Sequence, residues 1–127
     1  MRRATGRRGY RVSALIEDAP GVYCILNQQN SKVYIGEGSR CRLRLTQHYW
    51  NLKQGCHENK PMQADWNAQG GRGFVFDVLD YDSQHPGRFV LEAHYIALYQ
   101  SREPEFGYNR RYGRDHKSFV AWKAWVA

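Results

Sequence analysis

The sequence lacks any hydrophobic run long enough to cross a membrane. No stretch approaches the ~18 consecutive apolar residues that a transmembrane helix needs. The arginines near the start of the chain are not followed by the apolar segment of a signal peptide. We therefore expect no membrane partner and a cytoplasmic location.

Cysteine is scarce and irregularly spaced. The three cysteines, Cys24, Cys41 and Cys56, form no C-x-x-C pair. An odd number in a chain without an export signal predicts free thiols in a reducing compartment. Cys56 and His57 have only the distant His48 to join them, so the second spaced pair of a structural zinc site is missing.

Acidic residues are outnumbered, with 12 Asp and Glu against 19 Lys and Arg and a net charge of +7. The excess predicts a partner rich in phosphate, with nucleic acid ahead of an anionic membrane surface. A basic protein with no such partner has the same composition. Residues 1–13 hold five arginines and no acid. We predict that they form a basic, flexible arm that is ordered on nucleic acid or stays solvated.

What is present indicates one globular domain. The 127 residues, 42% hydrophobic and 14% aromatic, suffice to bury a modest core. No repeat or low-complexity segment divides the chain. We predict a single small α/β (α+β) domain over residues 14–127, with the element order β-β-α-α-β-α and a C-terminal helical tail in which residues 119–126 have helical spacing.

The clearest local pattern is a β-hairpin. Two short apolar runs, residues 21–26 and 33–36, enclose a polar segment with turn chemistry. Tyr23 and Tyr34 lie on the paired strands, and we predict that they face the same side. A third strand, residues 74–79, is apolar on both faces except at Asp77, which predicts a central place in the sheet.

Three helices are predicted from caps and apolar spacing. Ser39 is expected to cap the first, which ends near residue 54, and Asn59 the second, which ends near residue 69. On the first helix, Arg44 and His48 lie one turn apart and share an edge. The third spans residues 88 to about 101. Its expected core stripe is Phe89, Ala93, Ile96 and Ala97.

These motifs, in this order, resemble the GIY-YIG nuclease family over residues 21–109. The two strand motifs appear as Gly21-Val22-Tyr23 and Tyr34-Ile35-Gly36. The resemblance places the remaining family residues at Arg44, His48, His57, Glu92 and Asn109. It implies a three-stranded, mainly antiparallel sheet flanked by helices. The segment from residue 52 to 70 is similar to that of phage and intron homing endonucleases.

The resemblance implies a metal-dependent endonuclease that hydrolyses phosphodiester bonds of DNA, expected to be double-stranded, in one strand or both. Glu92 is the implied ligand of one Mg²⁺ or Mn²⁺ ion. Asp77 and Asp80 lie on the predicted third strand and could add a second carboxylate, but nothing in the sequence places them at the site. Arg44 suits the phosphate because its guanidinium gives bidentate contacts and keeps its charge. In isolation, Glu92 is an ordinary exposed helix glutamate.

The tyrosines are the implied activators of water. Either Tyr23 or Tyr34 can orient or deprotonate the attacking water, with Tyr23 favoured as the base. Arg44 and the metal ion are expected to favour the phenolate, and His48 to accept the proton onward. The alternative is that both tyrosines are ordinary strand residues packed on the core.

The remaining residues implied by the resemblance would bind DNA or hold the site in place. His57 would bind phosphate or assist proton transfer, or it is a plain loop histidine. Asn109 would hold the site together through hydrogen bonds. Basic residues expected to contact the DNA backbone are Arg40, Arg42, Lys53, Arg110, Arg111 and Arg114. The protein would then be associated with DNA or the nucleoid.

One departure from the family affects target recognition. Homing endonucleases usually carry a DNA-binding region after the nuclease domain, whereas about eighteen residues follow Asn109 here. Target recognition by a second domain is therefore expected to be absent, or to be supplied by another subunit in a homodimer or by a separate recognition subunit. Two other hypotheses are an inactive DNA- or RNA-binding module of the same fold and a structural protein that uses the aromatic tail. The complete set of catalytic residues disfavours the first, and the net positive charge disfavours the second.

Overall fold

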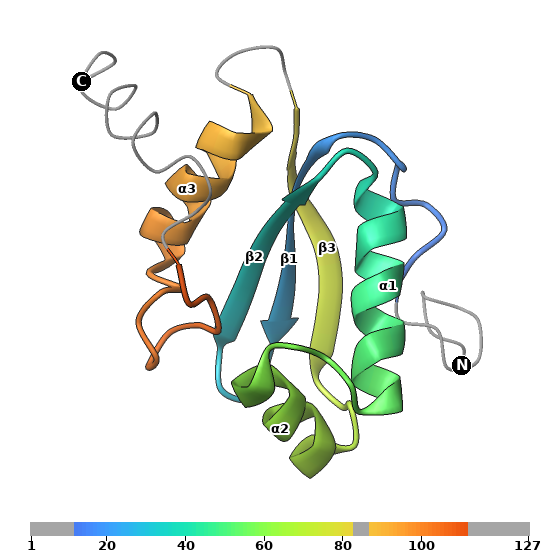
Figure 1. Cartoon of the computed structure of the whole chain (residues 1–127), viewed down its shortest axis with the longest axis vertical. Coiled ribbons are helices and arrows are strands. Elements are labelled where there is room, and N and C mark those ends of the chain that lie inside the picture. The colour runs from blue at the N-terminus through green and yellow to red at the C-terminus, as the bar shows by residue number, and fades with distance from the viewer. Residues whose placement is uncertain (1–11, 83–86, 112–127) are drawn as a thin grey trace.

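An antiparallel three-stranded sheet is packed between helices (Figure 1). The computed structural model describes residues 12–82 and 87–111. Its elements are β1 (Gly21–Asn27), β2 (Lys32–Gly38), α1 (Cys41–Gln54), α2 (Lys60–Gln69), β3 (Phe74–Tyr81) and α3 (Arg88–Tyr99). The predicted element order is confirmed. Most of the N-terminal arm and the expected C-terminal helix lie outside the described residues.

The hairpin β1–β2 forms because its connection carries turn chemistry. The amide of Ser31 donates to the carbonyl oxygen of Asn27 at 2.7 Å, and Ser31 adopts a positive φ of 65°. The Asn27 and Asn30 side chains each accept from the amide two residues further on, as in Asx turns. The register that results pairs Tyr23 with Gly36 and Ile25 with Tyr34. Directly opposed residues share a face, so the predicted common side of the two tyrosines is confirmed.

The prediction that the third strand is central is wrong. The strand order is β2-β1-β3, which puts β1 in the centre and β3 at an edge. On β3, Phe74 and Phe76 pack in one core cluster while Leu79 packs against another. The face that carries Phe74 and Phe76 is covered by α1, whereas Val75 and Asp77 on the other face are exposed and only Leu79 there packs under α3. Apolar residues on both faces therefore did not mean that the strand has neighbours on both sides.

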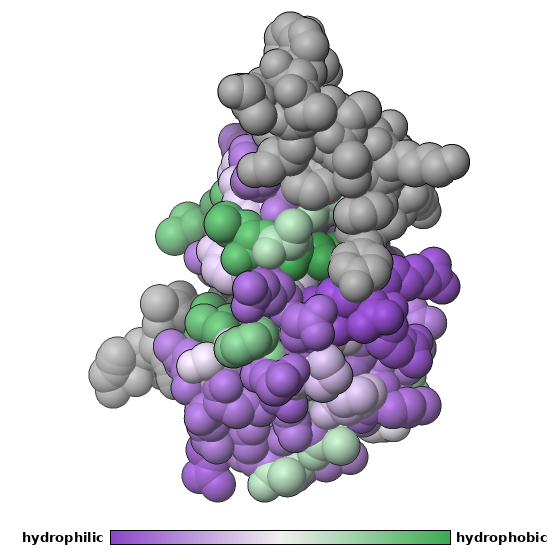
Figure 2. Space-filling model, turned by 90° about the vertical axis from the view of Figure 1, so that its left-hand side faces the viewer, coloured by the Kyte–Doolittle hydropathy of each residue, from purple (hydrophilic) through white to green (hydrophobic). Residues whose placement is uncertain are grey.

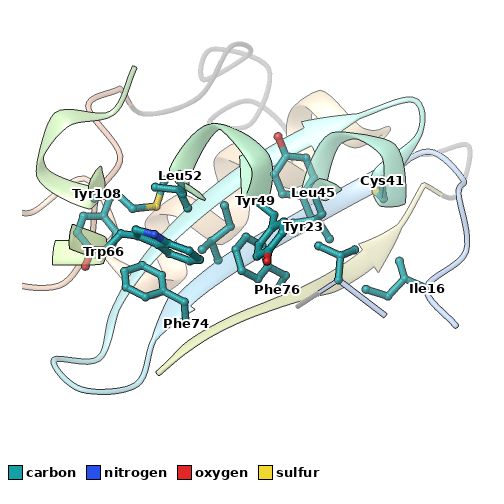
Figure 3. Packing of buried hydrophobic residues seen from close by; sticks show 13 residues of the cluster. Ile16, Tyr23, Cys41, Leu45, Tyr49, Leu52, Trp66, Phe74, Phe76 and Tyr108 are labelled. Atoms are coloured by element: carbon teal, nitrogen blue, oxygen red, sulfur yellow. The ribbon is translucent and has the colours of Figure 1, made fainter. Parts of the chain in front are cut away.

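Helix α1 covers one face of the sheet. Its buried residues Leu45, Tyr49 and Leu52 pack in one cluster with Tyr23 and the β3 phenylalanines (Figure 3). These residues recur at the apolar spacing from which the helix was predicted, and they form its buried face. The cap is different from the one predicted, because Ser39 precedes the N-cap residue Arg40 and no side chain of the helix itself caps it. Asp18 takes that place and accepts from the Leu43 amide at 2.9 Å.

Helix α3 covers the other face (Figure 1). Leu91 and Ile96 pack against Val22 and Ile35 of the sheet. The predicted core stripe was partly wrong: Phe89 is half-buried and Ala97 is exposed, whereas Val90, Leu91, Ala93 and Ile96 are buried. The buried arc is therefore centred on positions that the spacing argument did not choose.

The outer edge of β2 is covered by the segment that follows α3. Val33 donates to the carbonyl oxygen of Phe106 at 3.2 Å and accepts from the Tyr108 amide at 3.0 Å. A Cβ on Gly107 would lie 2.3 Å from the Ser101 backbone, so only glycine fits this close approach. This arrangement places residues 109–111 beside the end of the hairpin. No helix of the described residues has the length and apolarity to span a membrane.

Candidate active site

A cleft of about 350 Å³ opens beside β2, where residues from both faces of the sheet meet. Tyr23 and Tyr34 line it from one face, and Glu92 of α3 reaches it from the other. Its remaining lining residues are Ile35, Gly36, Glu37, Arg44, His57, Glu58, Asn59, Ile96, Asn109, Arg110 and Arg111. Of the predicted catalytic residues, only His48 is not in this lining. The side of the molecule that carries α3 is mostly hydrophilic (Figure 2).

Gly36 of the second strand motif lies directly against the ring of Tyr23 of the first motif. A Cβ on Gly36 would lie 2.5 Å from the Tyr23 hydroxyl oxygen, far inside van der Waals contact. The Tyr23 ring therefore lies against the bare backbone of β2, and any side chain at position 36 would displace it. The position of the tyrosine in the first motif therefore requires glycine in the second motif.

Behind Tyr23 lies a chain of buried hydrogen bonds. The Tyr23 hydroxyl is 2.8 Å from His48 Nε2, and His48 Nδ1 is 2.7 Å from His57 Nε2. The backbone N–H of Asn59 donates to His57 Nδ1 at 3.0 Å. His48 is 5% and His57 is 2% exposed. Both predicted histidines thus belong to one hydrogen-bonded chain with Tyr23, and His48 lies behind the residues that line the cleft.

Burial keeps both histidines neutral near pH 7. It lowers the pKa of His48 to about 3, and the neighbouring His57 and Arg44 act in the same direction. Burial also lowers the pKa of His57, against a smaller opposing effect of Glu58. Neither ring therefore carries a positive charge at neutral pH.

Burial also has the largest effect on the pKa values of the two tyrosines. It raises the pKa of Tyr23 above the usual phenol value, and the neighbouring Tyr34 and Glu92 add to the increase. Burial and Glu92 raise the pKa of Tyr34 as well. Arg44 acts in the expected direction at both tyrosines, but its charge does not outweigh burial. In the protein alone, both phenols are therefore protonated at neutral pH.

Asn109 joins the last segment to the hairpin. Its side chain accepts from the Ile35 amide at 2.8 Å and donates to the Ile35 carbonyl oxygen at 2.9 Å. The Ser101 hydroxyl donates to the same Asn109 oxygen at 2.7 Å. Ile35 is the residue between the tyrosine and glycine of the second motif, so Asn109 has the contacts of the holding role predicted for it.

The basic residues divide into two groups. Arg44, Arg110 and Arg111 line the cleft, and Gln47 holds the Arg44 guanidinium with a 2.8 Å hydrogen bond. Three further residues that were predicted to contact DNA have contacts within the protein itself. Arg40 binds Asp18, Arg42 donates to the carbonyl oxygens of Ala14 and Ile16, and the Lys53 ammonium lies 5.6 Å from the Trp50 ring centroid. Their DNA contacts stay a prediction, and Arg114 lies outside the described residues.

The family model for the GIY-YIG catalytic domain matches residues 19–109, well over half of the chain. The chain belongs to the GIY-YIG family. The match begins just before β1 and ends at Asn109, so it takes in the hairpin, the helices and the whole described lining of the cleft except its last two arginines.

Curated relatives of this GIY-YIG domain are intron endonucleases. The chain is 36% identical over 50 residues to intron-associated endonuclease 1 of Enterobacteria phage T4, an alignment of 39% of this chain and 20% of that protein. It is 28% identical over 102 residues to probable intron-encoded endonuclease 1 of Neurospora crassa, which covers 80% of this chain and 30% of the relative. The chain thus spans less than a third of either relative.

Two solved structures share the fold. The catalytic domain of homing endonuclease I-TevI superposes with a TM-score of 0.63 at 27% identity, covering 72% of this chain and 98% of that one. A mutant form of the same catalytic domain gives 0.63 at 26% identity, over 75% and 96%. The chain therefore carries an endonuclease catalytic domain of the GIY-YIG family, related to those of homing endonucleases.

The family implies a divalent metal ion, and the donor set of the cleft fits one. Among residues 12–82 and 87–111, no three His, Cys, Asp or Glu side chains are grouped to enclose a metal. Glu92, Glu58 and Glu37 all line the cleft, and Glu37 is paired with Arg88 at 2.8 Å. One carboxylate that shares the ion with water and phosphate oxygens is a set that Mg²⁺ accepts.

The other carboxylates considered for the metal lie elsewhere in this GIY-YIG domain. Asp77 and Asp80 are on β3, at the sheet edge opposite β2, and neither lines the cleft. Asp80 accepts a hydrogen bond from the Tyr95 hydroxyl at 2.9 Å. The sequence assigned both residues to the third strand but did not place them at the site, and neither adds a carboxylate to the cleft.

Three residues around the site were missed by sequence reasoning. Glu58 lines the cleft next to His57. Gln63 is buried on α2 and accepts from the His57 amide at 2.9 Å, which fixes the loop that carries the histidine. Ser101 is fully buried and bonds Asn109. A polar Gln63 between Met62 and Trp66, on the buried side of a short helix, was the one signal available in the sequence.

Proposed function

We propose that this GIY-YIG domain is a divalent-metal-dependent endonuclease that hydrolyses phosphodiester bonds of double-stranded DNA. The observation that supports it is the convergence of Tyr23, Tyr34, Arg44 and Glu92 on one cleft, from four different elements. Structural packing alone gives no reason for a carboxylate, a guanidinium and two phenols to share one opening. The intron endonucleases among its relatives favour a role similar to theirs.

Each group has a role that hydrolysis requires. A divalent cation at Glu92, Mg²⁺ or Mn²⁺, would withdraw charge from the phosphate and its leaving oxygen. Arg44 holds a non-bridging phosphate oxygen and stabilises the charge that grows there, because its guanidinium stays protonated. Arg110 and Arg111 bind the neighbouring backbone at the rim of the cleft.

The phenols act on the attacking water. Both lie in the lining of the cleft, and Tyr23 has the hydrogen-bonded support of His48. Tyr23 accepts the proton of the water as a phenolate or orients the water as a phenol, and Tyr34 positions water and phosphate. A single cleft cuts one strand at a time, so a double-strand break requires a second copy or a second binding event.

The test is cleavage of supercoiled plasmid in Mg²⁺, with an EDTA control and matched variants. Glu92→Gln and Arg44→Ala should each reduce the rate about 100-fold or more while the circular dichroism spectrum is kept. Glu105→Gln and Arg72→Ala change the same charges at exposed positions outside the cleft. Both controls should cut at the wild-type rate.

Two results would contradict the proposal. Retained cleavage by both Glu92→Gln and Arg44→Ala would show that the cleft is not the active site. Absence of cleavage by the wild-type protein in Mg²⁺ and in Mn²⁺, with DNA binding intact in a gel shift, would favour a binding module with the same fold.

A further inference from the structure

The hydrogen-bond chain behind Tyr23 ends on a backbone N–H, which can donate a hydrogen bond but cannot accept one. Asn59 presents its backbone N–H to His57 Nδ1 at 3.0 Å, and an amide N–H has a proton to give and no lone pair to offer. His57 Nδ1 must therefore be the unprotonated nitrogen of its ring. This fixes the proton position in the chain without any assumption about the chemistry in the cleft.

Asn59 is held firmly in this orientation. It is the N-cap of α2, and its side-chain oxygen accepts from the Met62 amide at 3.1 Å. Its side-chain nitrogen donates to the Tyr108 carbonyl oxygen at 2.7 Å, and the residue is 4% exposed. Rotating its N–H away from His57 would break a helix cap and a buried hydrogen bond together.

The direction of the other two hydrogen bonds follows from counting protons. A neutral imidazole has one N–H, and burial keeps both rings neutral. The N–H of His57 is then on Nε2 and donates to His48 Nδ1 at 2.7 Å. The N–H of His48 is on Nε2 in turn and donates to the Tyr23 oxygen at 2.8 Å.

We propose that His57 is a positioning residue that fixes the tautomer of His48, and that His48 donates a hydrogen bond to Tyr23 rather than accepting its proton. The catalytic meaning of this proposal rests on the proposed nuclease function. The Tyr23 hydroxyl proton is left to point away from His48, and the donated bond stabilises the phenolate. The sequence-based expectation that His48 passes the proton onward is thereby replaced.

A relay in the opposite direction would fail at its last step. If His48 took the Tyr23 proton at Nε2, it would pass its Nδ1 proton to His57 Nε2. His57 would then need its own proton on Nδ1, where the Asn59 N–H already points. Two hydrogens would face each other across 3.0 Å, in a site too buried for water to separate them.

The first test reads the tautomers directly and does not depend on activity. A long-range ¹H–¹⁵N NMR spectrum of the uniformly ¹⁵N-labelled full chain at pH 7 distinguishes protonated from unprotonated ring nitrogens. His48→Gln and His57→Gln assign the signals. Protonation of both rings at Nε2 is expected. A proton on His48 Nδ1, or a charged His48, would overturn the proposal.

The second test compares two substitutions of the positioning residue. His57→Gln keeps an N–H donor for His48, whereas His57→Leu offers none. We expect His57→Leu to lose the single Nε2 tautomer of His48 and to lower kcat for plasmid cleavage about 10- to 100-fold with KM little changed. His57→Gln should restore most of both.

The outcomes separate this proposal from the nuclease function. Equal losses in the two variants, with the His48 tautomer unchanged, would make His57 merely structural and refute its positioning role. The wrong tautomer together with Mg²⁺-dependent cleavage would refute this proposal and leave the nuclease. The expected tautomers in a protein that cuts no DNA would uphold the hydrogen-bond direction and refute the function.

Discussion

Burial decides the protonation of the side chains behind the cleft, while neighbouring charges make smaller contributions. Arg44 acts on Tyr23, Tyr34, His48 and His57, and at all four its effect ranks below that of burial. The apo site therefore holds two neutral phenols and two neutral imidazoles. Because Arg44 is already present in this site, a deprotonated tyrosine at neutral pH requires additional positive charge, which a bound metal ion would bring.

At the residue scale, the buried histidines predict that acid destabilises the protein. Their pKa values in the folded state lie below the unfolded value near 6.5, so between these values the unfolded chain binds more protons. Stability is then complete above about pH 6.5 and is lost as the pH falls toward about 3 for His48. In that window, each histidine that stays neutral in the folded protein lowers the free energy of unfolding by about 1.4 kcal/mol for every pH unit of acidification.

Urea unfolding at pH 7.5, 6.0 and 5.0 measures this effect above the range where most carboxylates titrate. His48→Gln should flatten the fall in stability because the buried titrating ring is gone. His94→Gln, a substitution outside the cleft, is the matched control and should keep the wild-type slope. A steep fall that survives in His48→Gln would contradict the prediction.

The candidate site residues were named from the sequence, but their contacts could not be. Tyr23, Tyr34, Arg44 and Glu92 stand at motif positions, and the cleft contains all four. The 2.7 Å contact between His48 and a loop histidine joins α1 to the start of α2. Its geometry depends on how Gln63 and Asn59 hold that loop, which no spacing pattern reports.

At the element scale, the start of α1 is stabilised from outside the helix. Asp18 accepts from the Leu43 amide and pairs with Arg40. We predict that Asp18→Ala lowers the urea midpoint, because it removes the only side-chain partner the described residues give to the first-turn amides of α1. Ser39→Ala should leave the midpoint unchanged, and the reverse order would restore Ser39 as the cap.

Element types were predictable where local chemistry decides them. Asn59 caps α2 as predicted, and Gly55 ends α1 in a left-handed conformation with a φ of 79°. Both follow from single-residue preferences. The edge position of β3 in the sheet and the capping of α1 by Asp18 were not predictable, because each depends on a segment far away in the sequence.

At the scale of the whole molecule, the positive charge is unevenly used. Three arginines line the cleft together with three glutamates, so the opening itself is close to neutral. Other cations bind the protein's own carbonyl oxygens, carboxylates and rings. The net charge of +7 predicted a phosphate-rich partner but could not say which cations face it.

Salt dependence of DNA binding distinguishes the cations that bind phosphate. The double variant Arg110→Ala/Arg111→Ala removes two exposed charges from the cleft, and the control Arg72→Ala removes one exposed charge outside it. Each phosphate contact contributes about 0.9 to the slope of log K against log salt. The cleft variant should lose about 1.8 of that slope and the control almost none, measured by fluorescence anisotropy with a short duplex in EDTA. A loss in Arg72→Ala as large, per charge removed, as that in the cleft variant would mean that the DNA contacts surfaces outside the cleft as closely as it contacts the cleft.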